Sequence, residues 1–210
     1  MIRNIIFDWS GTLIDDLPAV LEATNYVLKK AGLDALTLEK FRSEFSLPFT
    51  GFYQRYTPHI QMEQLEEWFH TKFNEVQDLV TEIKYAREFL QFCRQNNLKT
   101  IVLSSTRSDH YHKQATKTGF IDFIDSTYLG VRDKRHQIRE LLQTEKINPL
   151  QTLFVGDMEH DIETARLGGL YSCAVLTGYN EPHKLRFTEP DLIVENLAEL
   201  KEILEQCSFD

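Results

Sequence analysis

The chain has 210 residues, of which 42% are hydrophobic and 26% charged, and its formal net charge is −9. This length fits one good-sized domain or a domain with a smaller insertion, and the acidic balance argues against a nucleic-acid partner, because phosphate backbones bind basic patches. No apolar run approaches the roughly 20 residues that a membrane-spanning helix needs, so we expect a cytoplasmic protein with no membrane partner and with reduced Cys93, Cys173 and Cys207.

Six short runs rich in β-branched and apolar residues predict strands. Several of them are nearly continuous apolar stretches, which is typical of strands covered on both faces. In chain order the runs are residues 3–9, 98–105, 123–129, 152–157, 171–178 and 190–196. Helical stripes alternate with them, for example Ala86, Phe89, Leu90 and Cys93. This alternation predicts an α/β fold with a doubly wound parallel sheet.

The alternation is interrupted once, between about residues 16 and 84, where the sequence shows no convincing strand. A helical stripe covers residues 17–31, with Asp16 as a candidate N-cap and Gly32 as a candidate stop. A second stripe covers residues 65–76, and the segment 45–59 between them, with two prolines and a glycine, is interpreted as a loop or broken helix. A helical insertion therefore separates the first strand from the rest of the sheet.

Three of the predicted strands end in polar residues. Because ligands bind beyond the carboxyl ends of strands in open α/β sheets, we expect these side chains to meet at one place. The residues are Asp8, Ser10 and Thr12 after the first strand, Ser104 and Ser105 after the second, and Asp157 after the fourth, with Asp161 one helical turn later. Carboxylates that converge repel each other unless a hard cation lies between them, which indicates Mg²⁺.

Four motifs resemble those of the haloacid dehalogenase (HAD)-like hydrolase superfamily, whose members are mostly phosphatases. The stretch "DWSGTL" is similar to the first motif, D-x-D-G-T, except at Ser10, and "IVLSS" is similar to the second. Lys134 matches the lysine of the third motif, and "VGDMEHD" matches the fourth, G-D-x-x-x-D. The resemblance covers the whole chain, and the helical insertion and the tail resemble the phosphoglycolate-phosphatase-like branch.

This resemblance implies a HAD-like Rossmannoid core domain, residues 1–15 and 85–210, with a small helical cap domain, residues 16–84. It implies a Mg²⁺-dependent phosphate-ester hydrolase that acts through an aspartyl-phosphate on a small phosphorylated metabolite, as a monomer or homodimer. The implied catalytic positions are Asp8 as nucleophile, Ser10, Ser104 against the transferring group and Lys134 against its charge. The implied metal ligands are Asp8, the backbone carbonyl of Ser10, Asp157 and Asp161.

Ser10 stands where phosphatases of this family carry their acid/base. A serine hydroxyl cannot protonate a leaving group near neutral pH, and losing a general acid/base costs about 10²–10⁴ in rate. We therefore expect an atypical or slow hydrolase, with Glu159 or Asp15 as candidate substitutes, although Asp15 and Asp16 are expected to cap helices. Aromatic residues of the insertion, namely Phe49, Phe52 and Tyr53, are candidates for the mouth of the cap.

Two other interpretations stay open from the sequence. One is a catalytically weak or inactive protein that binds a phosphate ligand. The other is a relative of the phosphonoacetaldehyde hydrolases, whose first motif also lacks the acid. Those enzymes need a Schiff-base lysine in the cap, for which the candidates are Lys29, Lys30, Lys40 and Lys72.

Overall fold

A six-stranded parallel sheet forms the centre of the computed structural model, which describes residues 1–207. The strand order is β5-β4-β1-β6-β7-β8. The strands are β1 (Asn4–Phe7), β4 (Lys99–Leu103), β5 (Ser126–Tyr128), β6 (Thr152–Gly156), β7 (Tyr171–Val175) and β8 (Leu192–Val194). Each lies within one of the six predicted runs, so the predicted α/β parallel sheet is confirmed.

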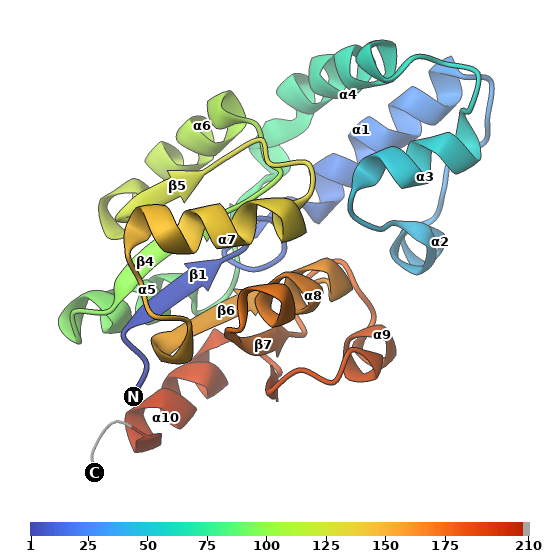
Figure 1. The fold of residues 1–210 in the computed structure, drawn as a ribbon. Coiled ribbons are helices and arrows are strands. Elements are labelled where there is room, and N and C mark those ends of the chain that lie inside the picture. The colour runs from blue at the N-terminus through green and yellow to red at the C-terminus, as the bar shows by residue number, and fades with distance from the viewer. Residues whose placement is uncertain (208–210) are drawn as a thin grey trace.

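Helices cover both faces of this sheet, as a doubly wound fold requires. The flanking helices are α5 (Ala86–Gln95), α6 (Ser108–Thr118), α7 (Lys134–Glu145), α8 (Glu159–Gly168), α9 (Pro182–Phe187) and α10 (Leu197–Cys207). Ile6 packs with side chains of α7 and α8 on one face, whereas Ile5 and Phe7 pack with those of α5 and α10 on the other. Figure 1 shows α7 and α8 in front of the sheet.

Four of the helices between β1 and β4 form the helical insertion. They are α1 (Leu17–Lys30), α2 (Leu38–Glu44), α3 (Phe49–Tyr56) and α4 (Met62–Val76). A two-stranded antiparallel sheet of β2 (Ile14–Asp15) and β3 (Thr81–Glu82) joins the two ends of this insertion, and short 3₁₀ helices cover Gln77–Leu79, Phe120–Phe123 and Pro149–Gln151. In Figure 1 the insertion lies beyond the end of the sheet toward which β1 points.

The insertion has its own apolar core, which also includes residues from the strand ends. Phe41, Phe52 and Leu65 of the insertion are buried together with Met158 and Tyr179, which follow β6 and β7. The insertion therefore packs directly on the edge of the sheet where the predicted site residues lie. The segment 45–59, expected to be a loop or a broken helix, contains the short helix α3 with irregular residues on either side.

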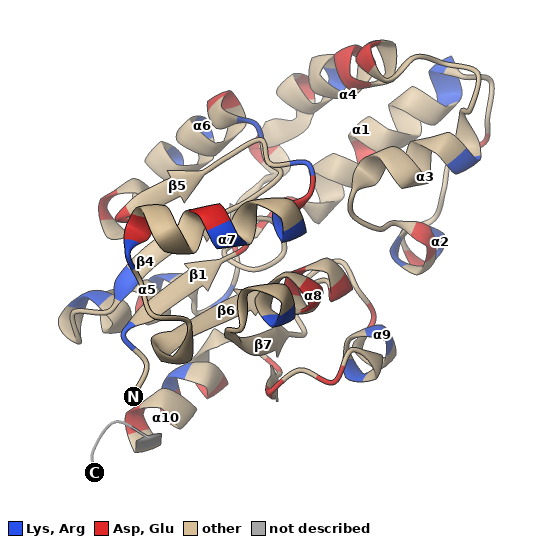
Figure 2. Ribbon diagram, in the orientation of Figure 1, with Lys and Arg blue, Asp and Glu red and all other residues tan. Residues whose placement is uncertain are grey.

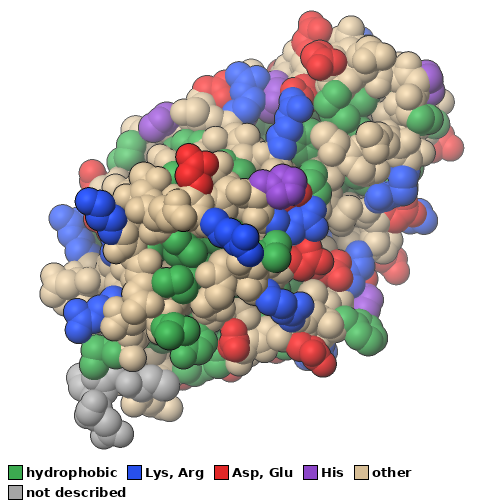
Figure 3. All heavy atoms as spheres, in the orientation of Figure 1, with side chains coloured by type: hydrophobic (Ala, Val, Ile, Leu, Met, Phe, Trp, Pro, Cys, Tyr) green, Lys and Arg blue, Asp and Glu red, His purple; other side chains and the backbone are tan. Residues whose placement is uncertain are grey.

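Charged side chains lie mainly on the helices and loops, because among the strands of the main sheet only β4 carries one, Lys99 (Figure 2). On the face shown in Figure 3 basic and acidic groups are interspersed. Cys93 and Cys173 are buried free thiols, as expected, whereas the side chain of Cys207 lies outside the described part of the chain. A search of the described residues identifies no helix long and apolar enough to cross a membrane.

Candidate active site

The register of the sheet brings the predicted carboxylates together. Phe7 of β1 lies opposite Val102 of β4 and Val155 of β6, and the amide of Asp8 donates to the carbonyl of Val155 at 2.9 Å. The residues that follow these strands therefore share one edge of the sheet. Oxygen atoms of Asp8, Asp157 and Asp161 all lie within 4.8 Å of one another, and all three residues are buried.

Lys134 lies between two of these carboxylates. Its Nζ is 2.7 Å from Oδ1 of Asp8 and 2.7 Å from Oδ1 of Asp161, and its side chain is fully buried. Lys134 is the first residue of α7, whose start is capped by Asp133, and its own amide donates to Nε2 of His160 at 3.1 Å. Burial alone would lower the pKa of Lys134, but the charges of Asp161 and Asp8 raise it, so the side chain stays protonated.

Asp157 is held rigidly by neutral donors. Its Oδ1 accepts from Oγ1 of Thr12 at 2.9 Å, and its Oδ2 accepts from the amide of Tyr179 at 2.7 Å. Gly11, with a φ of +78°, and Gly178 both approach so closely that a Cβ at either position would collide with the Asp157 carboxylate. The turns after β1 and β7 therefore need glycine in order to enclose this carboxylate.

The charge of the cluster fits a hard divalent cation. Burial raises the pKa of Asp8 to about 6, with Lys134 opposing and Asp161 adding to the rise. Burial also raises the pKa of Asp157 well above its usual value, and the charges of Asp8 and Asp161 raise it further. One ammonium group cannot balance three buried carboxylates, and oxygen donors of this kind are the ligands that Mg²⁺ or Ca²⁺ prefers. The backbone carbonyl of Ser10 as a further ligand stays a prediction.

The side chain of Ser10 pairs with a carboxylate that sequence reasoning assigned to another role. Its hydroxyl donates to Oδ2 of Asp16 at 2.6 Å and lies 3.2 Å from Oγ1 of Thr106. The hydroxyl of Tyr179 donates to Oδ1 of Asp16 at 2.8 Å, and burial raises the pKa of Asp16 to about 6. Asp16 does precede α1, as expected, but its carboxylate points to Ser10 and Tyr179 instead of capping the helix.

The second motif supplies hydroxyl groups next to Ser10. Oγ of Ser104 accepts from the amide of Thr106 at 3.1 Å and donates to its Oγ1, also at 3.1 Å. Ser104 itself is buried, and the next two residues, Ser105 and Thr106, face the cavity described below. A direct contact between Ser104 and a transferring group stays a prediction.

A cavity of about 290 Å³ lies between the sheet edge and the helical insertion, and Asp8, Ser10 and Asp16 form part of its wall. Phe49 and Tyr53 line it, as suggested for the mouth of the insertion, whereas Phe52 is fully buried in the core of the insertion. Among the residues that the structure describes, no lysine lines this cavity. Asp15 and Glu159, the candidate substitutes for the acid/base, do not line it either.

Comparison with known proteins agrees with this geometry. Residues 5–175 match the haloacid dehalogenase-like hydrolase family. The phosphoglycolate phosphatase of Synechococcus elongatus is 25% identical over 212 residues, covering 97% of this chain and 98% of its own. The pyrophosphatase PpaX of Oceanobacillus iheyensis is 23% identical, covering 95% of both chains. A haloacid dehalogenase-like hydrolase from Streptococcus pneumoniae has the same fold, with a TM-score of 0.81, 20% identity and coverage of 97% and 98%. The chain therefore belongs to the haloacid dehalogenase-like hydrolases.

Proposed function

We propose that this hydrolase cleaves phosphate monoesters with the help of Mg²⁺ and through a phosphorylated Asp8. The observation that carries the proposal is the position of Asp8 in the wall of a cavity, with Lys134 and two further buried carboxylates around it. The names of the relatives, a phosphoglycolate phosphatase and a pyrophosphatase, support a phosphorylated substrate.

The residues suggest how the reaction proceeds. Lys134 and the amide of Trp9 both bind Oδ1 of Asp8, which orients Oδ2 for attack on phosphorus. As the new Asp8–phosphorus bond forms, the bond from phosphorus to the ester oxygen breaks, and that oxygen takes up a proton from solvent as the alcohol leaves. Water then attacks phosphorus and gives up a proton to solvent, the bond between Asp8 and phosphorus breaks, and inorganic phosphate leaves with the carboxylate of Asp8 restored.

Charge compensation is the main requirement of this scheme, because a dianionic phosphate has to approach an anionic carboxylate. A bound Mg²⁺ would supply that compensation, and Asp8, Asp157 and Asp161 are the side chains that would hold it. Lys134 would contribute a second positive charge, fixed by its two ion pairs. The hydroxyls of Ser105 and Thr106 line the cavity and are placed to donate to phosphate oxygens.

Ser10 makes the proposed enzyme atypical. Its hydroxyl already donates to Asp16 and cannot act as an acid near neutral pH. We infer that esters whose leaving groups need a proton react slowly, whereas aryl phosphates react faster. The two alternative functions have less support, because the family members found are named as phosphatases and no lysine that could form a Schiff base lines the described cavity.

We also propose that residues 16–84 act as a cap on a core of residues 1–15 and 85–210. The support for this division is that the insertion packs over the strand ends and forms one wall of the cavity. Such a cap would exclude water from the site and would open to admit substrate.

The experiment that tests the function is a panel of phosphate esters assayed with Mg²⁺ and with EDTA, with Asp8→Asn as the control. We expect Mg²⁺-dependent phosphate release that the variant lacks, and a protein mass increased by one phosphoryl group during turnover. If the Asp8→Asn variant releases phosphate as fast as the wild-type protein, Asp8 is not the nucleophile.

A further inference from the structure

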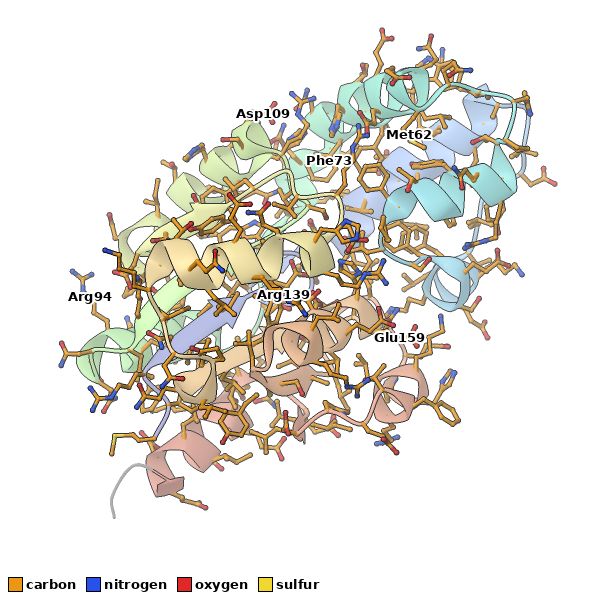
Figure 4. All side chains as sticks on the ribbon, viewed as in Figure 1. Met62, Phe73, Arg94, Asp109, Arg139 and Glu159 are labelled. Atoms are coloured by element: carbon orange, nitrogen blue, oxygen red, sulfur yellow. The ribbon has the colours of Figure 1, made fainter. Side chains whose placement is uncertain are left out.

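The wall of the cavity opposite Asp8 is apolar. Six side chains from the insertion make up most of it, namely Phe45, Leu47, Phe49, Tyr53, Phe69 and Phe73. Figure 4 labels Phe73, which lies on α4 where this helix passes α6. Rings of this kind gain free energy by burying an apolar group and gain little from an anionic one.

Cations on the cavity wall are already paired with carboxylates. Among the described residues, Arg107 and Arg132 are the only Lys or Arg side chains that line the cavity. Arg107 binds both oxygens of Asp109, at 3.0 and 2.7 Å, and Arg132 binds Glu66 at 2.8 Å. A second anionic group of a substrate would have to share a guanidinium with the carboxylate that is already paired to it, and would lie beside that negative charge.

The acidic residues and histidines of the wall do not favour a second anion either. Asp16 and Glu66 both face the cavity and add negative charge. His70 and His110 line the cavity as well, with 3.1 Å between Nδ1 of His70 and Nε2 of His110. They are neutral near pH 7, because burial lowers the pKa of both, that of His70 to about 4.

From this distribution of charge and apolar surface we infer that the preferred substrate is a phosphate monoester with a largely apolar leaving group that carries no anionic charge and is about the size of one ring. The inference rests on the proposed phosphatase function and narrows its substrate. It excludes substrates with a second anionic group, such as phosphoglycolate and pyrophosphate, as the preferred ones.

The size of the cavity agrees with this class of substrate. An apolar cavity of about 150 Å³ holds a benzene molecule, so about 290 Å³ leaves room for one ring together with a phosphate. Burying such a ring is worth about ten- to a hundredfold in affinity.

The test compares benzyl phosphate, ethyl phosphate and phosphoglycolate with the full chain and Mg²⁺. Benzyl phosphate and phosphoglycolate both release a poorly activated alcohol, so their comparison reports the fit of the group and not its leaving ability. We expect kcat/KM for benzyl phosphate to exceed that for phosphoglycolate by about tenfold or more. An equal or higher kcat/KM for phosphoglycolate would overturn the inference.

Two variants, each with a control at an exposed position, test whether the cavity wall sets this substrate preference. Phe49→Ala should lower the ratio of benzyl to ethyl phosphate turnover several-fold, whereas Phe187→Ala, at an exposed ring of α9, should leave it unchanged. Glu66→Gln frees Arg132 for an anion and should raise kcat/KM for phosphoglycolate, whereas Glu63→Gln, at an exposed position of the same helix, should not. A Phe49→Ala variant with an unchanged ratio would contradict the assignment of this wall.

A binding measurement separates this inference from the proposed function. Benzylphosphonate and phosphonoacetate are uncleavable counterparts of benzyl phosphate and phosphoglycolate. Calorimetry with Mg²⁺ gives their affinities without any turnover. Tighter binding of benzylphosphonate, by about tenfold, supports the inference even if no ester is hydrolysed, in which case only the proposed reaction is wrong. Tighter binding of phosphonoacetate overturns the inference whether or not the enzyme turns over.

Discussion

At the scale of single residues, Lys134 supplies the positive charge that offsets the buried carboxylates of Asp8 and Asp161. Lys134→Ala would remove the ammonium that lies 2.7 Å from both Asp8 and Asp161 and would leave those carboxylates buried without their partner. Breaking a buried ion pair on one side costs about 3–5 kcal/mol. We therefore expect the variant to lose stability of this order in EDTA and to regain part of it with Mg²⁺.

Urea unfolding in EDTA and in Mg²⁺ measures this effect. Lys113→Ala, which removes an exposed lysine of α6, is the control and should change little under either condition. A Lys134→Ala variant as stable as the wild-type protein in EDTA would show that the three carboxylates do not depend on this ammonium.

Ser10 and Asp16 lead to a second prediction, which concerns an exchange of the two side chains. Ser10→Asp alone places a carboxylate where the hydroxyl now lies 2.6 Å from Asp16, so the two charges would repel each other. The double variant Ser10→Asp/Asp16→Ser keeps one hydroxyl and one carboxylate in contact and puts the carboxylate at the usual acid position. We expect about tenfold or more faster hydrolysis of alkyl phosphates by the double variant.

The gain should be smaller for nitrophenyl phosphate, whose leaving group departs without a proton. Melting temperatures of the single and double variants test the repulsion independently of activity, and the single variant should melt at the lower temperature. A double variant that folds and binds Mg²⁺ but hydrolyses every ester at the wild-type rate would rule out the missing acid as the cause of slow turnover.

The contact between these two residues could not be predicted from the sequence. An aspartate before a helical stripe indicates an N-cap, and Asp16 does occupy that position. Its actual partners are Ser10 and Tyr179, and the latter lies 163 residues further along the chain. By contrast, Asp8, Lys134 and Asp157 could be found because each stands at a strand or helix end within a motif of recognisable spacing.

At the scale of elements, periodicity predicted long or fully buried segments well and short ones poorly. All six strands of the main sheet lie within apolar runs, but β2 and β3 have only two residues each, too few for a pattern. The prolines and the glycine of 45–59 suggested a break, yet Pro48 stands at the N-cap of α3, where no backbone N–H is needed. Pro48 therefore marks the start of a helix here, while Gly51 lies within that helix and Pro58 follows its end.

The contact between α4 and α6 gives a prediction about pH. His70 and His110 stack with ring centroids 5.1 Å apart, and Phe73 packs against His110. Burial lowers the pKa of His70 from 6.5 to about 4, with the charge of Arg107 assisting and that of Asp109 opposing. The unfolded chain therefore binds a proton at a higher pH than the folded one. The stability from neutral His70 is fully present above about pH 6.5 and is lost as the pH falls toward 4.

Melting curves between pH 7.5 and 4.5 test whether stability falls with pH in this direction. His70→Asn should show a smaller fall in melting temperature on acidification than the wild-type protein, since the asparagine does not titrate. His59→Asn, at an exposed position of the insertion, should keep the wild-type pH dependence. Identical pH profiles for His70→Asn and the wild-type protein would mean that this histidine does not couple the fold to pH.

At the scale of the whole molecule, the insertion is joined to the sheet at several separate points around the cavity. Glu66 of α4 pairs with Arg132 after β5, and Nζ of Lys184 on α9 donates to the carbonyls of Arg42 and Ser43 at 3.1 and 2.7 Å. These contacts are exposed or half-buried, and surface ion pairs contribute only about 0–1 kcal/mol each. These polar contacts are weak enough to break when the proposed cap opens, but the buried packing of the insertion on Met158 and Tyr179 would have to open with them.

The last prediction concerns stabilisation of the whole fold by Mg²⁺. The site draws its carboxylates from the ends of β1 and β6 and from α8, so it exists only when the sheet has formed. A ligand that binds the folded state alone stabilises it by about 2.7 kcal/mol at a hundred times its dissociation constant. We therefore expect millimolar Mg²⁺ to raise the melting temperature by several degrees, because about 1 kcal/mol shifts it by about 2–4 °C for a chain of this length.

Asp157→Asn should reduce the rise in melting temperature, whereas Asp34→Asn, at an exposed position of the insertion, should preserve it. A melting temperature that Mg²⁺ leaves unchanged, with or without phosphate, would show that the three carboxylates do not form a metal site.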